Sequence, residues 1–150
     1  MIFYISRIQQ RGIPETMLDT FLKQFALGEN VSPKQYSPLT LAYIGDAVYE
    51  LFVRTYLIKD ANFPVNRLHK EAIHLVNAKA QSDLYQKIKD ELSEEEMQIY
   101  KRGRNTNSHP PKNADMVDYK SATGVEALIG YLYLMNESDR ITELLMHLTD

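Results

Sequence analysis

Residues 41–50 read LAYIGDAVYE, and this stretch sets the fold class of the chain. Apolar residues recur here at helical spacing, and they surround the helix on nearly every side instead of forming a single stripe. Ser37 can cap this helix, and Pro38 suits its first position because no N–H is needed there. The pattern predicts a central helix over residues 38–59, buried on most of its faces.

The segments on either side also carry helical spacing, and none alternates apolar and polar residues for long enough to predict a strand. The other expected helices cover residues 14–27, 66–92 with a break near Asn77, 93–102, 115–135 and a C-terminal segment around 141–148. Gly28 and Gly103 are expected to end two of them, Gly103 in the left-handed conformation. The sequence therefore predicts an all-α fold of about seven helices.

Two boundaries follow from local composition. Residues 105–113 hold two prolines and three asparagines, which predicts an irregular, exposed loop of the kind that often contacts a ligand. Residues 1–16 look peripheral, and because Met17 is a plausible alternative start, they are interpreted either as an N-terminal extension of the domain or as an artefact of the assigned gene start. Residues 17–150 are expected to form a single domain.

The composition limits the kinds of site that the chain can build. Its 150 residues are 44% hydrophobic, which is enough for one sizeable core, and they include no cysteine. A disulfide framework and a thiolate metal site are therefore excluded, so a metal must bind to oxygen or histidine. The apolar run at residues 1–5 meets a charge at Arg7 and is too short for a signal or membrane segment. We expect a cytoplasmic protein without a membrane partner.

Two carboxylates stand out because each lies mid-helix in an otherwise apolar segment. Asp46 is the one early charge of the first apolar helix, and Glu126 is the one charge within residues 125–135 of the second. Gly45 lies next to Asp46 and Gly130 one turn after Glu126, and glycine inside a helix usually marks close approach of another backbone. If the two helices cross there, both carboxylates could reach one Mg²⁺ ion. Alternatively, each carboxylate faces a solvated groove or forms a hydrogen bond across packed helices. A helical protein-interaction module is another interpretation of the chain, but it leaves the two carboxylates unexplained.

Charge is unevenly distributed along the chain. The net charge is −3, which argues weakly against nucleic acid, but a compact basic group follows an acidic stretch at residues 90–96. This group consists of Lys101, Arg102 and Arg104, with Lys112 further on. These four residues are candidates for phosphate contacts, and a solvated surface is the alternative.

Several motifs together indicate a family. Residues 41–50 resemble the signature helix of the ribonuclease III family, and residues 125–131, VEALIGY, resemble its second catalytic helix. Residues 68–70, 75–77, 101–105 and 111–114 are similar to the compact Mini-III branch, which has no separate RNA-binding domain. The chain departs from the longer enzymes at Leu39, Ala42 and Thr123, where that family usually has acidic residues. The resemblance thus implies a site with fewer carboxylate ligands.

The resemblance also implies an activity, a cofactor and an assembly. It predicts an endoribonuclease that cuts double-stranded RNA and leaves 5′-phosphate and 3′-hydroxyl ends, with precursor 23S ribosomal RNA as the substrate. Asp46 and Glu126 would hold Mg²⁺, for which Mn²⁺ substitutes. A homodimer would form through the signature helices, and the apolar side chains of Leu39 and Tyr43 are its expected contacts. Loss of acidic positions motivates the alternative, a non-catalytic RNA-binding scaffold with the same fold.

Overall fold

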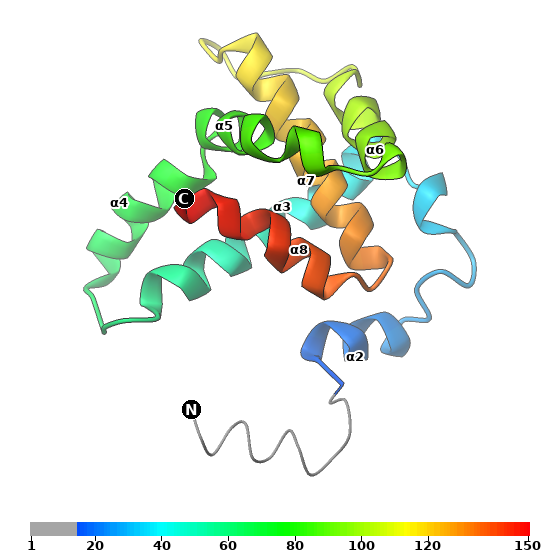
Figure 1. Ribbon diagram of the computed structural model, residues 1–150, viewed down its shortest axis with the longest axis horizontal. Helices are drawn as coiled ribbons and strands as arrows, with labels where there is room; N and C mark the ends of the chain where they lie inside the picture. Colours follow the sequence, from blue (N-terminus) through cyan, green and yellow to red (C-terminus); the bar gives the residue numbers. More distant parts are fainter. Residues whose placement is uncertain (1–14) are drawn as a thin grey trace.

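The computed structural model describes residues 15–150, which form seven α-helices and three 3₁₀ turns (Figure 1). The helices are α2 (Met17–Gln24), α3 (Pro38–Ile58), α4 (Val65–Val76), α5 (Ala78–Ile88), α6 (Glu94–Arg104), α7 (Met116–Leu134) and α8 (Ser138–Leu145). The 3₁₀ turns are η1 (Pro33–Gln35), η2 (Lys89–Glu91) and η3 (Met146–Thr149). No strand occurs in this part of the chain, so the all-α prediction is confirmed. The predicted extension falls almost wholly on residues 1–14, outside the described residues.

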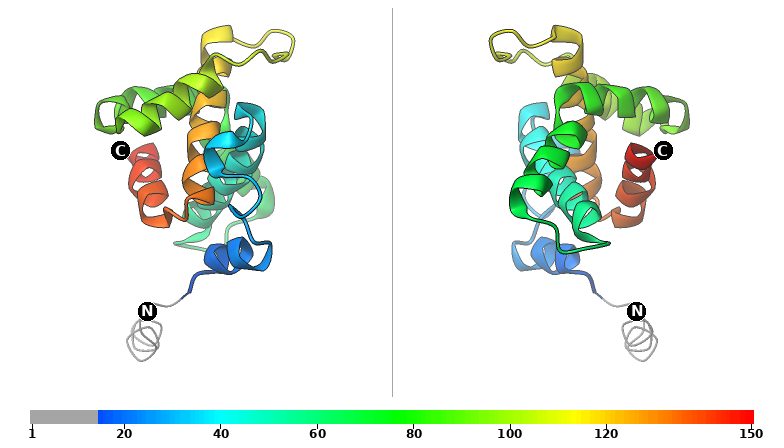
Figure 2. Two further views of the ribbon diagram at one scale, coloured as in Figure 1. Left: turned by 90° about the vertical axis from the view of Figure 1, so that its right-hand side faces the viewer. Right: turned by 90° about the vertical axis from the view of Figure 1, so that its left-hand side faces the viewer.

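Helix α7 forms the centre of the molecule, and α3, α5, α6 and α8 pack around it (Figures 1 and 2). From Ser121 to Tyr133, every residue of α7 is buried except Glu126. Helix α4 continues from α3 and packs on it before the chain turns into α5. This arrangement places the core between α7 and its four neighbours, which explains why α7 is apolar on all faces.

The predicted helix starts and the predicted break are confirmed by their capping contacts. Ser37 Oγ accepts a hydrogen bond from the backbone N–H of Thr40, with Pro38 in the first position of α3. Asn77 separates α4 from α5 and its side chain accepts from Ala80 N at 2.8 Å. Ser93 forms a capping box with Glu96 at the start of α6, where the sequence predicted a helix to begin. Short-range side-chain to backbone bonds of this kind can be predicted from sequence because both partners lie within one turn.

The predicted end of α6 was wrong. Gly103 does not stop the helix in the left-handed conformation: it is a buried helical residue, and α6 continues to Arg104. A Cβ atom at Gly103 would lie 2.8 Å from Ala127 Cβ and 2.9 Å from Gly124 Cα. Gly103 therefore serves the close packing of α6 on α7, a long-range contact that the local pattern does not encode.

The first predicted helix is shorter in the structure. The described part of residues 14–27 is helical only over Met17–Gln24, and Thr16 and Asp19 form a capping box at its start. Phe25 is the C-cap and Ala26 already has a positive φ of 49°. Gly28 does adopt a left-handed φ of 94°, but it lies beyond the helix end, in the turn that leads to η1.

In the single chain α3 is buried along one side, which departs from the prediction of burial on most faces, whereas the residues expected at a dimer contact, Leu39 and Tyr43, are exposed. Buried residues line the side that packs on α7, but large apolar side chains on other sides are open to solvent. Tyr43 is 81% exposed, Leu51 46% and Leu39 45%. The sequence showed that the faces are apolar, and the packing shows that this chain alone covers only part of them. Within residues 15–150, no helix is both long and apolar enough to traverse a membrane.

Candidate active site

Helices α3 and α7 cross in direct backbone contact. A Cβ atom on Gly45 would lie 1.7 Å from the carbonyl oxygen of Glu126, and one on Gly130 would lie 1.9 Å from that of Leu41. No side chain fits at either position, so glycine is required on both helices. The close crossing that the two glycines predicted is confirmed, and it places Asp46 of α3 next to Glu126 of α7.

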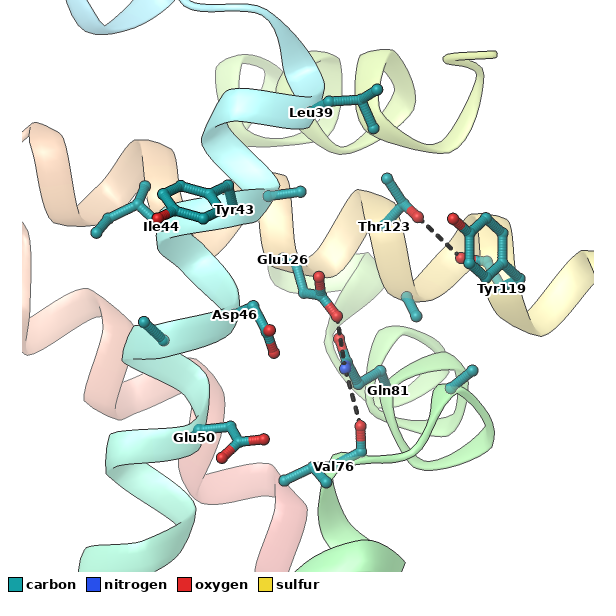
Figure 3. A pocket seen from close by; sticks show the side chains of 14 residues that line it. Leu39, Tyr43, Ile44, Asp46, Glu50, Val76, Gln81, Tyr119, Thr123 and Glu126 are labelled. Carbon is teal, nitrogen blue, oxygen red and sulfur yellow. Dashed lines mark hydrogen bonds between the residues drawn. The ribbon is translucent and has the colours of Figure 1, made fainter. Parts of the chain in front are cut away.

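Both carboxylates face one open hollow on the surface (Figure 3). The hollow has a volume of about 810 Å³ and lies between α3, the α4–α5 turn and α7. Asp46 is exposed, whereas Glu126 is partly buried. The described residues that line the hollow include no lysine, arginine or histidine; they are Leu39, Ala42, Tyr43, Ile44, Asp46, Ala47, Glu50, Val76, Ala78, Gln81, Tyr119, Ala122, Thr123 and Glu126.

The electrostatic environment disfavours negative charge in the hollow. Burial raises the pKa of Glu126 to about 7, and the nearby carboxylates of Asp46 and Glu50 add to this, while the hydrogen bond from Gln81 opposes it. Partial burial also raises the pKa of Asp46, with a further contribution from Glu50. Among residues 15–150, neither carboxylate thus has a cationic side chain close enough to stabilise its ionised form. A bound cation would supply this stabilisation.

Glu126 is held by a contact that the sequence did not reveal. Gln81, which is buried on α5, donates from Nε2 to Glu126 Oε1 at 2.9 Å and to the backbone carbonyl oxygen of Val76 at 3.1 Å (Figure 3). Forty-five residues separate Gln81 from Glu126. A single glutamine in a mostly polar helix gives no signal of such a contact, and only the folded chain brings the two together.

A third carboxylate, Glu50, lines the same hollow one helical turn after Asp46. It accepts hydrogen bonds from Arg54 at 3.0 and 3.2 Å. Spacing along α3 could have indicated it, because residues i and i+4 share a helix face. Among residues 15–150, no three acidic, histidine or cysteine side chains come close enough to form a metal cage. A cation here would therefore retain several water ligands, which suits Mg²⁺.

The uncharged positions noted in the sequence also border the hollow. Ala42 lies on α3, and Thr123, on α7, donates from Oγ1 to the backbone carbonyl of Tyr119 at 3.1 Å. Leu39 lies at the rim. The hollow is thus polar at Asp46, Glu50, Gln81 and Glu126 and largely apolar elsewhere.

The four basic candidates occupy different environments. Arg102 donates to the backbone carbonyls of Lys34 and Tyr36, at 3.1 and 3.3 Å, and so fastens the η1 segment to α6. Arg104 lies over the ring of Tyr100, 5.8 Å from its centroid, and donates to Asn105. Lys101 and Lys112 are exposed. Lys112 lies in the irregular loop over residues 105–113, which projects from the molecule where α7 begins (Figure 2).

Comparisons with known proteins place this site in a family. The model of the ribonuclease III domain matches residues 39–137, a range that includes both catalytic candidates. Mini-ribonuclease 3 of Clostridium tetani is 50% identical over 129 residues, covering 83% of this chain and 85% of the relative. Mini-ribonuclease 3 of a Thermoanaerobacter species is 52% identical over 110 residues, covering 73% and 78%. A crystal structure of a Fusobacterium nucleatum protein matches with a TM-score of 0.68 and 38% identity, covering 73% of this chain and 88% of that one.

Proposed function

This chain belongs to the Mini-III branch of the ribonuclease III family and is an endoribonuclease, and from that premise we propose that it cleaves double-stranded RNA with Mg²⁺ held by Asp46 and Glu126. One observation carries the proposal. Two carboxylates from crossing helices face one hollow whose described lining contains no basic side chain. A divalent cation would stabilise the ionised form of Glu126, whose pKa is raised mainly by burial and further by the carboxylates of Asp46 and Glu50.

The two carboxylates have different tasks at this site. Glu126 is fixed by Gln81 and offers an oriented oxygen, whereas Asp46 is exposed at the opening of the hollow and can adjust to a ligand. When bound, Mg²⁺ polarises a phosphate oxygen and lowers the pKa of a coordinated water. Neither carboxylate needs to act as a nucleophile, so the carboxylates bind and orient. With Ala42 and Thr123 uncharged, the protein supplies few ligands, which favours a site rich in water.

Duplex RNA suits the surface around the hollow. Lys101, Arg104 and Lys112 lie at the end of α6 and in the following loop, where they can contact phosphates. Duplex RNA is recognised mostly by its shape, its phosphates and its 2′-hydroxyl groups, so we expect weak sequence preference. The proposed products carry 5′-phosphate and 3′-hydroxyl ends. Structured precursor 23S ribosomal RNA is the proposed natural substrate, and the cytoplasm the proposed location.

The proposed active form is a homodimer. Leu39 and Tyr43 border the hollow and are exposed on the face of α3 that α7 leaves uncovered. Pairing of two such faces would remove large apolar side chains from water and place two hollows in one assembly. The site in each hollow could then cut one strand of the duplex, which would give a staggered double cut.

The proposal is tested by incubating the full chain with a labelled RNA duplex, with the same strand unpaired, and with a DNA duplex. Each reaction is run with Mg²⁺, with Mn²⁺ or with a chelator. We expect cleavage of the RNA duplex alone, with either metal. We also expect the products to carry a 5′-phosphate, which allows them to be ligated. Cleavage in the chelator would contradict the metal assignment. Duplex binding without cleavage would instead support a non-catalytic scaffold, the alternative suggested by the uncharged Ala42 and Thr123.

A further inference from the structure

Gln81 combines three properties that are unusual for a glutamine. Its side chain is only 3% exposed, it lines the hollow, and its amide nitrogen contacts Glu126. The amide is not needed to cap α5, because Asn77 already does so. A buried polar side chain of this kind is usually retained for a specific hydrogen bond.

The two acceptors around Gln81 determine the orientation of its amide. Nε2 has two N–H groups, and it donates one toward Val76 O and one toward Glu126 Oε1. The reversed amide would place its oxygen against a carbonyl and a carboxylate, both of which only accept when Glu126 is ionised. The observed orientation leaves Gln81 Oε1 buried without a hydrogen-bond donor among the described residues. Holding Glu126 thus takes precedence over satisfying the glutamine itself.

The contact also restrains which carboxylate oxygen faces outward. Gln81 engages Oε1 of Glu126, and no bond from the described residues is found to its Oε2. Val76 is the last residue of α4, so the same amide ties the α4–α5 turn to α7. The side chain of Glu126 is therefore held by a residue of the neighbouring helix α5. Asp46 has no comparable restraint among residues 15–150.

We propose that Gln81 is a positioning residue for the cation site: it anchors one oxygen of Glu126 so that the other is directed toward the cation shared with Asp46. The inference rests on the proposed function and extends it to a residue outside the carboxylate pair. Partners that hydrogen-bond a metal ligand commonly change metal affinity about 10- to 100-fold when removed. Gln81 acts through Glu126 and need not touch the substrate.

The test compares Mn²⁺ binding to the full chain by calorimetry for the wild type, Gln81→Met and a matched control. Methionine preserves the length of the side chain and removes its hydrogen-bonding groups. Gln86→Met is the control, because Gln86 is an exposed glutamine on the same helix whose side chain bonds only Lys89. The Mn²⁺ dissociation constant should rise about 10- to 100-fold for Gln81→Met and stay unchanged for Gln86→Met. The Mg²⁺ concentration for half-maximal cleavage should rise in parallel.

A second comparison separates positioning from a purely structural role. In a Glu126→Ala background, Gln81→Met should not weaken Mn²⁺ binding further, because the residue through which Gln81 acts is gone. Gln81→Leu replaces Gln81→Met if the latter does not fold. A Gln81 variant with a lowered unfolding temperature and unchanged Mn²⁺ affinity would overturn the proposal. If the wild type binds Mn²⁺ but does not cut duplex RNA, the proposed function alone fails, since the binding comparison uses no RNA.

Discussion

Helices α3 and α7 each contribute one carboxylate and one glycine to the crossing, but the rest of the fold treats them differently. Helix α7 is enclosed by α3, α5, α6 and α8, and Glu126 is the single break in a buried run. Helix α3 packs on α7 along one side and leaves Leu39, Tyr43 and Leu51 exposed on others. The difference shows that apolar helices have two uses in this chain. Helix α7 fills the core, whereas α3 fills part of the core and also presents an apolar surface to solvent.

The same difference applies to the two acidic residues. Glu126 is held within the packed layer by Gln81, and burial is the main cause of its raised pKa. Asp46 is exposed at the opening of the hollow, and its pKa is raised by its partial burial and by the nearby Glu50.

The largest effect is expected when either carboxylate loses its charge. Asp46→Asn and Glu126→Gln should each lower single-turnover cleavage of duplex RNA by about a thousand-fold or more, because cation binding supplies several kcal/mol of transition-state stabilisation. The double variant should be little worse than either single one, since residues that serve one cation act as a unit. Asp83→Asn is the control, as Asp83 is exposed on α5 and pairs with Lys79. Substantial activity of Asp46→Asn at saturating Mg²⁺ would remove Asp46 from the site.

A second prediction tests the crossing itself. Replacing glycine by alanine inside a helix normally stabilises it by up to about 1 kcal/mol. Gly130→Ala should instead destabilise the fold by about 3 kcal/mol, because the new Cβ would lie 1.9 Å from Leu41 O and the helices must separate. Thermal unfolding should show a midpoint lowered by about 10 °C. An unchanged or raised midpoint would mean that the two helices do not touch through their backbones.

A third prediction concerns the exposed face of α3. Leu39→Arg should convert a dimer to a monomer, because the symmetric arrangement would place two like charges near the two-fold axis. Double-strand cleavage should fall with dimer loss. Val117→Arg introduces the same charge at a 74% exposed apolar position of α7 and should leave the assembly unchanged. Analytical ultracentrifugation decides, and a wild type that is monomeric yet fully active would contradict the paired-cut mechanism.

A smaller effect is expected from pH. Glu126, with a pKa of about 7, must lose its proton to bind a cation, so the Mn²⁺ dissociation constant should fall about tenfold between pH 6 and pH 8. In the absence of metal, a rise in pH has an unfavourable effect on folding stability. The folded chain retains a proton that the unfolded chain releases, so this group lowers the unfolding free energy as pH rises from 4.5 to 7. Calorimetry across this range checks the first effect, and Glu126→Gln should abolish both.

Sequence predicted the features of this site that depend on short spacing or on one residue type. The glycines near the two carboxylates indicated the crossing, Ser37 located the start of α3, and the break at Asn77 separated α4 from α5. It did not predict the contact of Gln81 with Glu126, because no local pattern relates residues on different helices. On α3 it singled out Leu39 and Tyr43 for an exposed face but not Leu51, since the faces are all apolar and only packing assigns them.

The segments that precede α3 and α7 differ in the opposite sense to the helices, and this gives the last prediction. Arg102 fastens the segment before α3 through the carbonyls of Lys34 and Tyr36, whereas Lys112 lies exposed in the loop before α7. Arg102→Ala should therefore lower the unfolding free energy by about 1 kcal/mol, since two exposed charge-assisted hydrogen bonds are lost, and should change RNA binding little.

Lys112→Ala should leave stability unchanged and reduce the slope of log affinity against log salt by about one, because one phosphate contact disappears. The cleavage position should not move, as phosphate contacts carry no sequence information. Binding titrations at several salt concentrations, together with chemical unfolding, separate the two residues. Equal flattening of the salt slope by both variants would show that Arg102 leaves its carbonyls to bind RNA.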